Sequence, residues 1–437
     1  MPYAPHTEAE VRAMLADLGL ERLEELYAHL PADLLDPPIE LPEPMNEDAL
    51  LRHLAEVAAR NRPGRVFLGG GVRDHFVPAI VDTVAGRGEF LTAYTPYQPE
   101  ASQGVLQAIF EYQTMIAELT ALDVANASLY DGASALAEGV LLALRATRRM
   151  RAMVSRGVHP EYRQVLATYL NAVGADLEEV PLEGDRTPAF AVADDVGAVV
   201  VQSPNFLGAI ESYAPLAEAA HAAGALLVVV ADPLSLAVLR PPGEQGADVA
   251  VGEGQPLGNP MSLGGPHFGY IAVREGLLRQ LPGRLVSMTE DAEGRRGFVL
   301  ALSAREQHIR RAKARSNITT NAQNAALRAT VHLAALGPEG LKGVALATAA
   351  AARRLYQLLL EAGGVRPLTR PPFFAEFALR LPKDPAEVRS LLAETGYHGA
   401  YPIPEYGEGA ALFAASERMT EDDLLAFARA FFVAVGG

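Results

Sequence analysis

The chain has 437 residues, 49% hydrophobic and 21% charged, which provides core material for two or more structural units and excludes a disordered or low-complexity protein. Its 53 acidic residues outnumber its 37 basic residues, and the formal net charge of −16 argues against binding to nucleic acid or to an anionic membrane. The absence of cysteine excludes disulfides, thiolate nucleophiles and cysteine-ligated metal.

The first part of the chain predicts an N-terminal helical arm over residues 1–60. Apolar residues recur at approximate helical spacing over 7–30, with a break expected near Gly19. Five prolines make residues 31–44 a stiff connector. A second helix follows over about 46–60.

Residues 61–304 predict a large α/β domain. Short valine-rich runs alternate with amphipathic helices, and continuous apolar strands are typical of a mainly parallel sheet that helices cover on both faces. We expect strands at 177–181, 198–202, 226–231 and from 248, and helices at 131–149, 160–173 and 212–223.

Residues 305–350 predict interdomain helices, and residues 351–437 predict a small C-terminal α/β domain. Alanine, leucine and arginine dominate this region, which favours two long helices at 321–336 and 341–362. The last part alternates strands at 374–381 and 412–415 with helices at 385–395 and 421–435.

Two polar turns follow predicted elements of the large domain. Asp131 and Ser134 open a helix, where backbone amides and a hydroxyl can bind phosphate, although an ordinary helix cap explains them as well. Asp232 ends a buried strand, where the ligand sites of parallel sheets lie, and a cap for the next turn is equally consistent. Glu253 and Gln255 follow the next strand and are expected at the same edge.

An arginine-rich segment over 305–315 has a local charge of +4 in this acidic chain. Arginine clusters suit phosphate or carboxylate recognition, while the alternative is a solvated helix face with internal ion pairs. Ser316, Asn317 and Thr319 follow directly and favour a turn that faces an anion.

A second candidate is the proline-fixed loop that contains Tyr94, Tyr97 and Gln98. Because proline fixes the backbone, both tyrosine rings are expected to point in defined directions rather than to join a core. The Gly69–Gly71 run lacks the glycine spacing of a dinucleotide fingerprint, and we interpret it as a flexible turn.

Four segments, AYTPYQPEASQG, LGGGVRDHFVPA, SLGGPHFG and REQHIRRAKARSNITTNAQ, resemble the glycine cleavage system P-protein family, the glycine decarboxylases. The similarity runs nearly end to end, and the length matches the N-terminal half of the long single-chain form. The chain therefore resembles subunit 1 of the split form. The resemblance implies the aspartate-aminotransferase-like fold, fold type I of the pyridoxal-phosphate enzymes, with a large, mostly parallel sheet and a small C-terminal domain.

The chain departs from the chemistry of this family at one position. Pyridoxal phosphate forms a Schiff base with a lysine, and the position of that lysine falls near Gln255. Nothing before Lys313 has a primary amine side chain, so we expect no catalytic lysine in this chain. Asp232 matches the aspartate that pairs with the pyridinium, so Asp232 and Ser134 are interpreted as parts of a vestigial site.

The resemblance implies a partner that holds pyridoxal phosphate covalently: a homologous, lysine-bearing subunit 2. The pair would decarboxylate glycine and transfer the aminomethyl group to the lipoyl arm of the H-protein. Residues of this chain would reach across the interface, with Ser316, Asn317 and Thr319 toward the cofactor phosphate. Tyr94, Tyr97 and Gln98 would lie at the entrance for substrate and lipoyl arm.

Two other functions stay open. The chain could be a structural subunit that only stabilises its partner, or a self-sufficient enzyme of the same fold that binds pyridoxal phosphate non-covalently. No metal site is expected. Neither a signal peptide nor a membrane span is visible, so we expect a cytoplasmic protein.

Overall fold

The computed structural model describes residues 6–35, 37–38, 40–61, 64–91 and 94–436. The chain divides into two compact units, Met1–Arg62 and Pro63–Gly437. Within the described ranges, none of the helices combines the length and the hydropathy needed to cross a bilayer.

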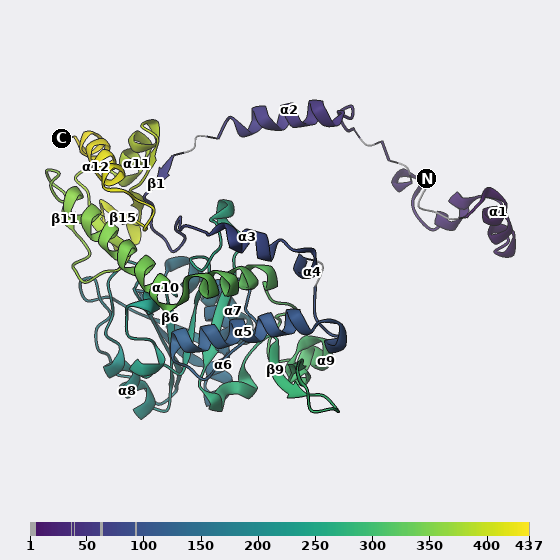
Figure 1. Ribbon diagram of the computed structural model, residues 1–437, viewed down its shortest axis with the longest axis horizontal. Coiled ribbons are helices and arrows are strands. Elements are labelled where there is room, and N and C mark those ends of the chain that lie inside the picture. Colours follow the sequence, from purple (N-terminus) through teal and green to yellow (C-terminus); the bar gives the residue numbers. More distant parts are fainter. Residues whose placement is uncertain (1–5, 36, 39, 62–63, 92–93, 437) are drawn as a thin grey trace. The chain divides into compact units, whose positions relative to one another are not determined.

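The first unit contains two α-helices, α1 (Glu8–Asp17) and α2 (Glu47–Ala58), with 3-10 turns η1 (Leu23–Tyr27) and η2 (Ala32–Leu34) between them (Figure 1). The break predicted near Gly19 is present, since Gly19 adopts a left-handed φ of +71° after α1, but the chain beyond it forms only the 3-10 turn η1 instead of continuing as a helix to residue 30. Among the described residues of this unit, only Leu15 is buried. Its helices therefore expose leucines that have no core within the unit.

The second unit is built on a seven-stranded sheet with the order β2-β8-β7-β6-β5-β3-β4. The strands β7, β6, β5, β3 and β4 are parallel, and β8 and β2 are antiparallel to their neighbours. The bounds are β2 (Val124–Ala125), β3 (Arg151–Ser155), β4 (Asp176–Val180), β5 (Val196–Ser203), β6 (Leu226–Ala231), β7 (Val249–Glu253) and β8 (Gly269–Val273). This is the mostly parallel α/β sheet that the valine-rich runs predicted.

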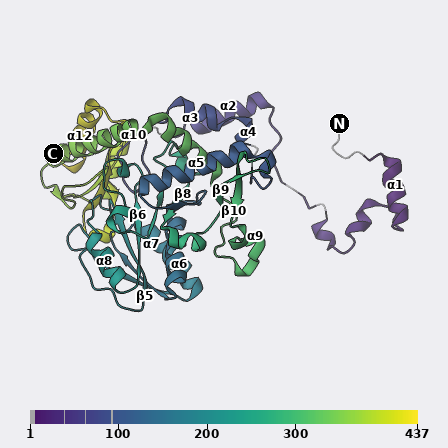
Figure 2. The ribbon, with the colours of Figure 1, turned by 60° about the horizontal axis from the view of Figure 1, so that its bottom comes forward.

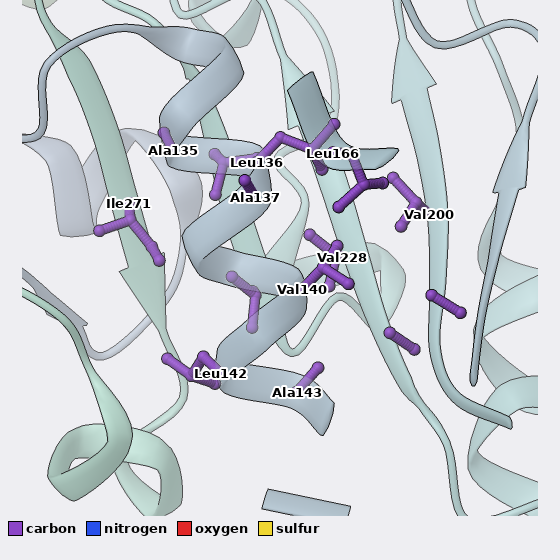
Figure 3. Close-up of a cluster of buried hydrophobic side chains, with 14 of the residues drawn as sticks. Ala135, Leu136, Ala137, Val140, Leu142, Ala143, Leu166, Val200, Val228 and Ile271 are labelled. Atoms are coloured by element: carbon purple, nitrogen blue, oxygen red, sulfur yellow. The ribbon is translucent and has the colours of Figure 1, made fainter. Parts of the chain in front are cut away.

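Helices cover both faces of this sheet. On one face, α6 (Gly132–Thr147) and α7 (Pro160–Val173) pack against apolar side chains of the parallel strands. Figure 3 shows Leu136 and Val140 of α6 directed at this layer, beside Val200 and Val228. The other face is covered by α8 (Ala214–Ala222), α5 (Gln103–Thr120) and α10 (Gln323–Leu359), and α5 and α10 lie side by side (Figures 1 and 2).

A smaller antiparallel sheet has the order β11-β12-β15-β14 and carries α11 (Pro385–Glu394) and α12 (Glu421–Val435). Its strands are β11 (Arg366–Pro367), β12 (Glu376–Arg380), β14 (Tyr401–Pro402) and β15 (Ala410–Ala414). The start of the unit joins this region, because β1 (Arg65–Val66) pairs in parallel with β13 (Tyr397–His398). Phe67 then enters the small core and stacks on Phe427 with ring centroids 4.0 Å apart.

The segment between the two sheets differs from the helical prediction. Residues 303–313 form only short turns, namely η8 (Ser303–Arg305), α9 (Gln307–Arg310) and η9 (Arg311–Lys313). They follow a hairpin of β9 (Leu285–Glu290) and β10 (Arg296–Ala301) that the sequence pattern did not indicate. The two predicted long helices are present as α10, which is interrupted where Gly337 adopts a φ of +61° before Pro338.

Short elements connect the rest of the second unit. They are α3 (Ala79–Ala85), α4 (Gly88–Leu91), η3 (Pro99–Ala101), η4 (Ser235–Ala237), η5 (Gly243–Gln245), η6 (Ser262–Gly264), η7 (Glu275–Gln280) and η10 (Pro404–Tyr406).

Candidate functional site

The carboxyl ends of β6 and β7 bring the predicted polar turns together, as the topology of a parallel sheet requires. Asp232 follows β6, and one of its carboxylate oxygens accepts hydrogen bonds from the backbone N–H groups of Leu234 (2.9 Å) and Ser235 (3.3 Å). The other oxygen accepts from the Arg73 guanidinium. Asp232 is therefore both a cap for the next turn and one half of a buried ion pair.

Arg73 is the cation at this edge, and only 6% of its side chain is exposed. Its second terminal nitrogen donates to Glu376 of β12 at 2.8 Å. The guanidinium therefore lies between the carboxylate of Asp232, at the end of a strand of the large sheet, and the carboxylate of Glu376 in the small sheet. Sequence reasoning missed this residue, although it lies in the LGGGVRDHFVPA segment.

Gln255 occupies the position at which the resemblance places the lysine, and it is fully buried. Its amide oxygen accepts from the Arg73 backbone N–H at 3.2 Å, and its amide nitrogen donates to the Arg73 carbonyl at 2.9 Å. The same nitrogen donates to the Asn259 carbonyl at 2.9 Å. The side chain thus fastens the Arg73 backbone to the turn after β7.

The start of α6 is satisfied by residues of this chain. The Asp131 carboxylate accepts from the Ser134 N–H at 2.7 Å, and the Asp131 N–H donates to the Ser134 hydroxyl at 3.3 Å, which is a reciprocal helix cap. Glu253 of β7 accepts from the Gly132 N–H at 3.1 Å. A Cβ at Gly132 would overlap the Tyr162 hydroxyl and the Glu253 nitrogen, so nothing larger than glycine fits there.

Burial raises the pKa of Glu253 to about 7, and the nearby Asp131 carboxylate adds to the effect. Between about pH 4.5 and pH 7, the Glu253 carboxyl is therefore protonated in the folded chain and ionised in the unfolded chain, where its pKa is near 4.5. The contribution of Glu253 to stability is complete below about pH 4.5 and is lost as the pH rises through about 7.

We expect the free energy of unfolding of Glu253→Gln, compared with that of the unmodified chain at the same pH, to increase by about 2 kcal/mol as the pH rises from 5 to 8. The reason is that the glutamine has no proton to lose, whereas Glu253 loses its proton in this range.

Thermal unfolding at several pH values checks this expectation. The exposed carboxyl of Glu339 on α10 provides the control, because Glu339→Gln is expected to leave the pH dependence unchanged. A stability difference between Glu253→Gln and the unmodified chain that stays constant from pH 5 to pH 8 would contradict it.

The second group of predicted residues lies at the surface, around a buried arginine. Tyr94 and Gln98 are exposed, and Tyr97 is 52% exposed. The Tyr97 hydroxyl accepts from Arg284 at 3.3 Å, and the guanidinium lies 5.7 Å from the centre of the Tyr97 ring. His308 meets the same ring edge-on, with centroids 5.7 Å apart.

Arg284 also holds the turn before α10. It is 3% exposed and donates to the Thr319 carbonyl and to the Thr320 hydroxyl, each at 2.7 Å. The Tyr130 hydroxyl accepts from the Thr319 N–H at 3.0 Å and lies 3.3 Å from the Thr319 hydroxyl. Tyr97 and Thr319, which lie more than 200 positions apart in the sequence, are therefore brought together by one guanidinium.

Ser316, Asn317 and Thr319 do not share one orientation. Asn317 and Thr319 are exposed. The Ser316 hydroxyl accepts from the Ile318 N–H at 3.0 Å and hydrogen-bonds the buried Glu138 carboxyl, whose pKa is raised by burial in spite of that bond. Ser316 is thus engaged within the chain, whereas Thr319 is accessible.

The arginine-rich segment is not a helix face. Arg305 is anchored inside, where it donates to the carbonyls of Leu281 and, at 3.0 Å, Gly283. Arg310 donates back to the Ala304 carbonyl at 3.1 Å, while Arg311 and Arg315 are exposed. Sequence reasoning missed Arg284 and Tyr130. Only Tyr130 had a usable signal, because it directly precedes the predicted helix cap at Asp131.

The family model described as glycine cleavage system P-protein matches residues 1–431. The chain belongs to the glycine cleavage system P-protein family. A curated relative from Moorella thermoacetica, named probable glycine dehydrogenase (decarboxylating) subunit 1, is 49% identical over 97% of both chains. A relative of the same name from Carboxydothermus hydrogenoformans is 48% identical over 97% of this P-protein chain and 98% of its own.

Solved structures agree with this assignment. A crystal structure of glycine decarboxylase (P-protein) of the glycine cleavage system, in inhibitor-bound form, has a TM-score of 0.94 and 64% identity, and the match covers 99% of this chain and 100% of that one. An aspartate aminotransferase from Thermus thermophilus shares the fold at 17% identity, with a TM-score of 0.59 over 85% of this chain and 99% of its own. This P-protein chain therefore has the aspartate-aminotransferase-like fold of the type I pyridoxal-phosphate enzymes.

The pocket of this P-protein chain does not fit pyridoxal phosphate. The cavity left beside Arg73, Asp232 and Glu253 has a volume of about 60 Å³. Sites for small molecules and cofactors typically measure roughly 300–1,000 Å³. The Asp232 carboxylate is already paired with Arg73, and the Gly132 N–H is already hydrogen-bonded to Glu253. Gln255 has no amine that could form a Schiff base.

Proposed function

We propose that this chain is the lysine-free subunit of a split glycine decarboxylase and acts together with a homologous subunit that holds pyridoxal phosphate on a lysine. The observation that carries the proposal is Gln255, which is buried at the lysine position with both ends of its amide bonded to the Arg73 backbone. A chain whose pocket contains neither an amine nor space for the cofactor needs a partner to decarboxylate glycine. Pyridoxal phosphate on the partner would supply the electron sink for the carbon–carbon cleavage.

The role of this chain follows from the surface that Arg284 organises. The exposed Thr319 hydroxyl offers a donor to the phosphate of the partner's cofactor, in keeping with the turn that this fold uses across its dimer interface. Exposed Tyr97, with Tyr94 and Gln98 in the same loop, would wall the entrance for glycine and for the lipoyl arm of the H-protein. Aromatic rings there would exclude water while charge develops on the substrate carbon.

A mixture of the two subunits with substitutions only in this chain tests the proposal. Thr319→Ala is expected to weaken retention of pyridoxal phosphate by the partner by about 1–2 kcal/mol, the contribution of one hydrogen bond to a phosphate. Tyr97→Phe and Tyr97→Ala are expected to lower glycine turnover while the subunits still assemble. Cofactor retention, turnover and assembly are measured on the same preparations.

Thr114→Ala is the matched control, because this exposed threonine on α5 donates back to the Phe110 carbonyl of its own helix at 2.9 Å. If all Thr319 and Tyr97 variants match this control in the mixture, the chain has a structural role only. Glycine turnover by this chain without a partner would instead identify a self-sufficient enzyme. Either outcome contradicts the proposal.

The N-terminal unit is proposed to bind the partner. Leu50, Leu54 and Val57 form an exposed stripe on α2, and Leu41 is 78% exposed. Among its described residues, the unit offers no core of its own to cover this stripe, and the partner subunit is the surface proposed to cover it. Deleting residues 1–62 is expected to weaken association with the partner at least tenfold, because about 1.4 kcal/mol of apolar contact would already account for that factor.

Sedimentation of the mixed subunits over a concentration series measures this effect. Leu50→Ser/Leu54→Ser within α2 is the narrower variant, and Arg52→Ser on the same helix, where Arg52 pairs with Asp48, is its control. Unchanged association after deletion of residues 1–62 would exclude a role for the arm.

A further inference from the structure

The loop of residues 69–76, which we call the clasp loop, lies between the large and the small sheet and is bonded to both. On the side of the large sheet, Gln255 holds the Arg73 backbone through both ends of its amide, and the ring of His159, the N-cap residue of α7, lies 3.0 Å from the Gly70 carbonyl. The flexible turn expected from the glycine run is thus a fixed element.

On the side of the small sheet, two carboxylates accept hydrogen bonds from backbone N–H groups of the clasp loop. The N–H groups of Gly70 and Gly71 donate to the two oxygens of Glu376, each at 3.1 Å. This geometry requires the left-handed φ values of +109° and +99° that these glycines adopt. At the far end, the Phe76 N–H donates to Glu417 at 2.7 Å, and His75 pairs with the same carboxylate at 2.8 Å.

Three contacts that the resemblance assigns to a type I cofactor are made in this pocket by residues of the chain. Arg73 supplies the positive charge opposite Asp232, which a pyridinium would supply. Glu253 supplies the oxygen that accepts the Gly132 N–H at the start of α6, where a phosphate oxygen would accept. Gln255 replaces the amine and binds the Arg73 backbone. We infer that this pocket is filled from within and works as a permanent clasp that fixes the two sheets of this chain in one closed arrangement.

The charges explain why the clasp is permanent. Arg73 and its two carboxylate partners, Asp232 and Glu376, are largely buried, with side-chain exposures of 6%, 16% and 10%. Separating the two sheets would break the charge-assisted hydrogen bonds between Arg73 and at least one of these carboxylates. Arg73 is covalently part of the chain, so it cannot leave the pocket as a bound cofactor could. Arg73 is thus a positioning residue.

Hydrogen exchange of the full-length chain, in the assembly in which it purifies, tests the clasp. In Arg73→Met, the amides of Gly70, Gly71 and Phe76 are expected to exchange at least about tenfold faster, as for the loss of one charge-assisted hydrogen bond. Arg151→Met is the control. Arg151 also bridges two carboxylates, Glu178 at 2.5 Å and Asp195 at 3.0 Å, but both belong to the large-sheet region and lie away from the clasp loop.

In the control, the three amides are expected to exchange as in the unmodified chain. If Arg73→Met does not fold, the double variant Arg73→Met/Asp232→Asn is used. It removes the unpaired charge of Asp232 and leaves Glu376 available to the glycine amides, and we expect the same faster exchange of the three amides. Unchanged exchange in whichever Arg73 variant folds would overturn the clasp.

A second measurement tests whether the pocket is filled. Gln255→Lys is incubated with pyridoxal phosphate, reduced with borohydride and mapped by peptide analysis. Because Arg73 and Glu253 keep their positions, no stoichiometric adduct is expected at residue 255. A stoichiometric adduct there would show that the pocket admits the cofactor and would overturn the inference. Both measurements concern this chain's own pocket and need no glycine turnover, so their result is independent of the proposed function.

Discussion

Replacing Arg284 with methionine is expected to reduce glycine turnover of the mixed subunits by about tenfold to a hundredfold and to weaken cofactor retention by the partner at the same time. The guanidinium is buried and donates to Thr319, Thr320 and Tyr97. Without it, both groups proposed to reach the partner lose their common support, and displacements of about 1 Å in such a site can cost a hundredfold in rate. The loss of these bonds is also expected to destabilise the chain by about 2–3 kcal/mol.

The control for Arg284→Met is Arg149→Met. Arg149 also ties two distant carbonyls, donating to Val196 at 2.8 Å and Ala223 at 2.7 Å, and neither belongs to the proposed interface. Its loss is expected to lower stability and to leave turnover per assembled complex unchanged. Arg284→Lys is expected to recover little, because an ammonium cannot reproduce the planar fork. Equal turnover in Arg284→Met and Arg149→Met would contradict the role of Arg284.

Replacing Phe427 with alanine is expected to destabilise the chain by about 3–5 kcal/mol, the usual cost of a large cavity in a core. The ring is fully buried in the small core, where it stacks on Phe67 and Phe431 and meets Phe413 edge-on. Denaturant unfolding of the full-length chain measures the effect. Val433→Ala on the same helix, 75% exposed, is expected to change stability by less than about 0.5 kcal/mol.

If Phe427→Ala lowered the free energy of unfolding as little as Val433→Ala, the packing of Phe67 on this ring would not contribute to stability. We also expect Phe427→Ala to destabilise the clasp loop, because Phe67 lies shortly before it in the sequence.

The large sheet was predictable because its strands are buried on both faces and therefore read as continuous valine runs, as in β5 and β6. The hairpin β9–β10 was not, because the outer half of β9 is exposed and its residues resemble a loop. The two-residue strand β1 carries no periodicity at all, and only its distant partner β13 makes it a strand.

The candidate site divides in the same way. Asp232, Glu253 and Gln255 were predictable at one edge because strand order places them there. Arg73 was not, because an arginine in a glycine-rich run is typical of a solvated loop, and its carboxylate partners lie 159 and 303 positions away. Ser316 and Thr319 looked equivalent in the sequence, and only the path of the turn directs one inward and leaves the other exposed.

The pairing of β1 with β13 also has a consequence during protein synthesis. Arg65 is paired with Tyr397, so about 330 residues must be added before its partner strand exists. At roughly 5–20 residues per second, the ribosome needs about 20–60 s for that length. During this time, Phe67 has no native core to pack into, because Phe427 is also absent. The small core can therefore close only after the C-terminal part of the chain has been synthesised.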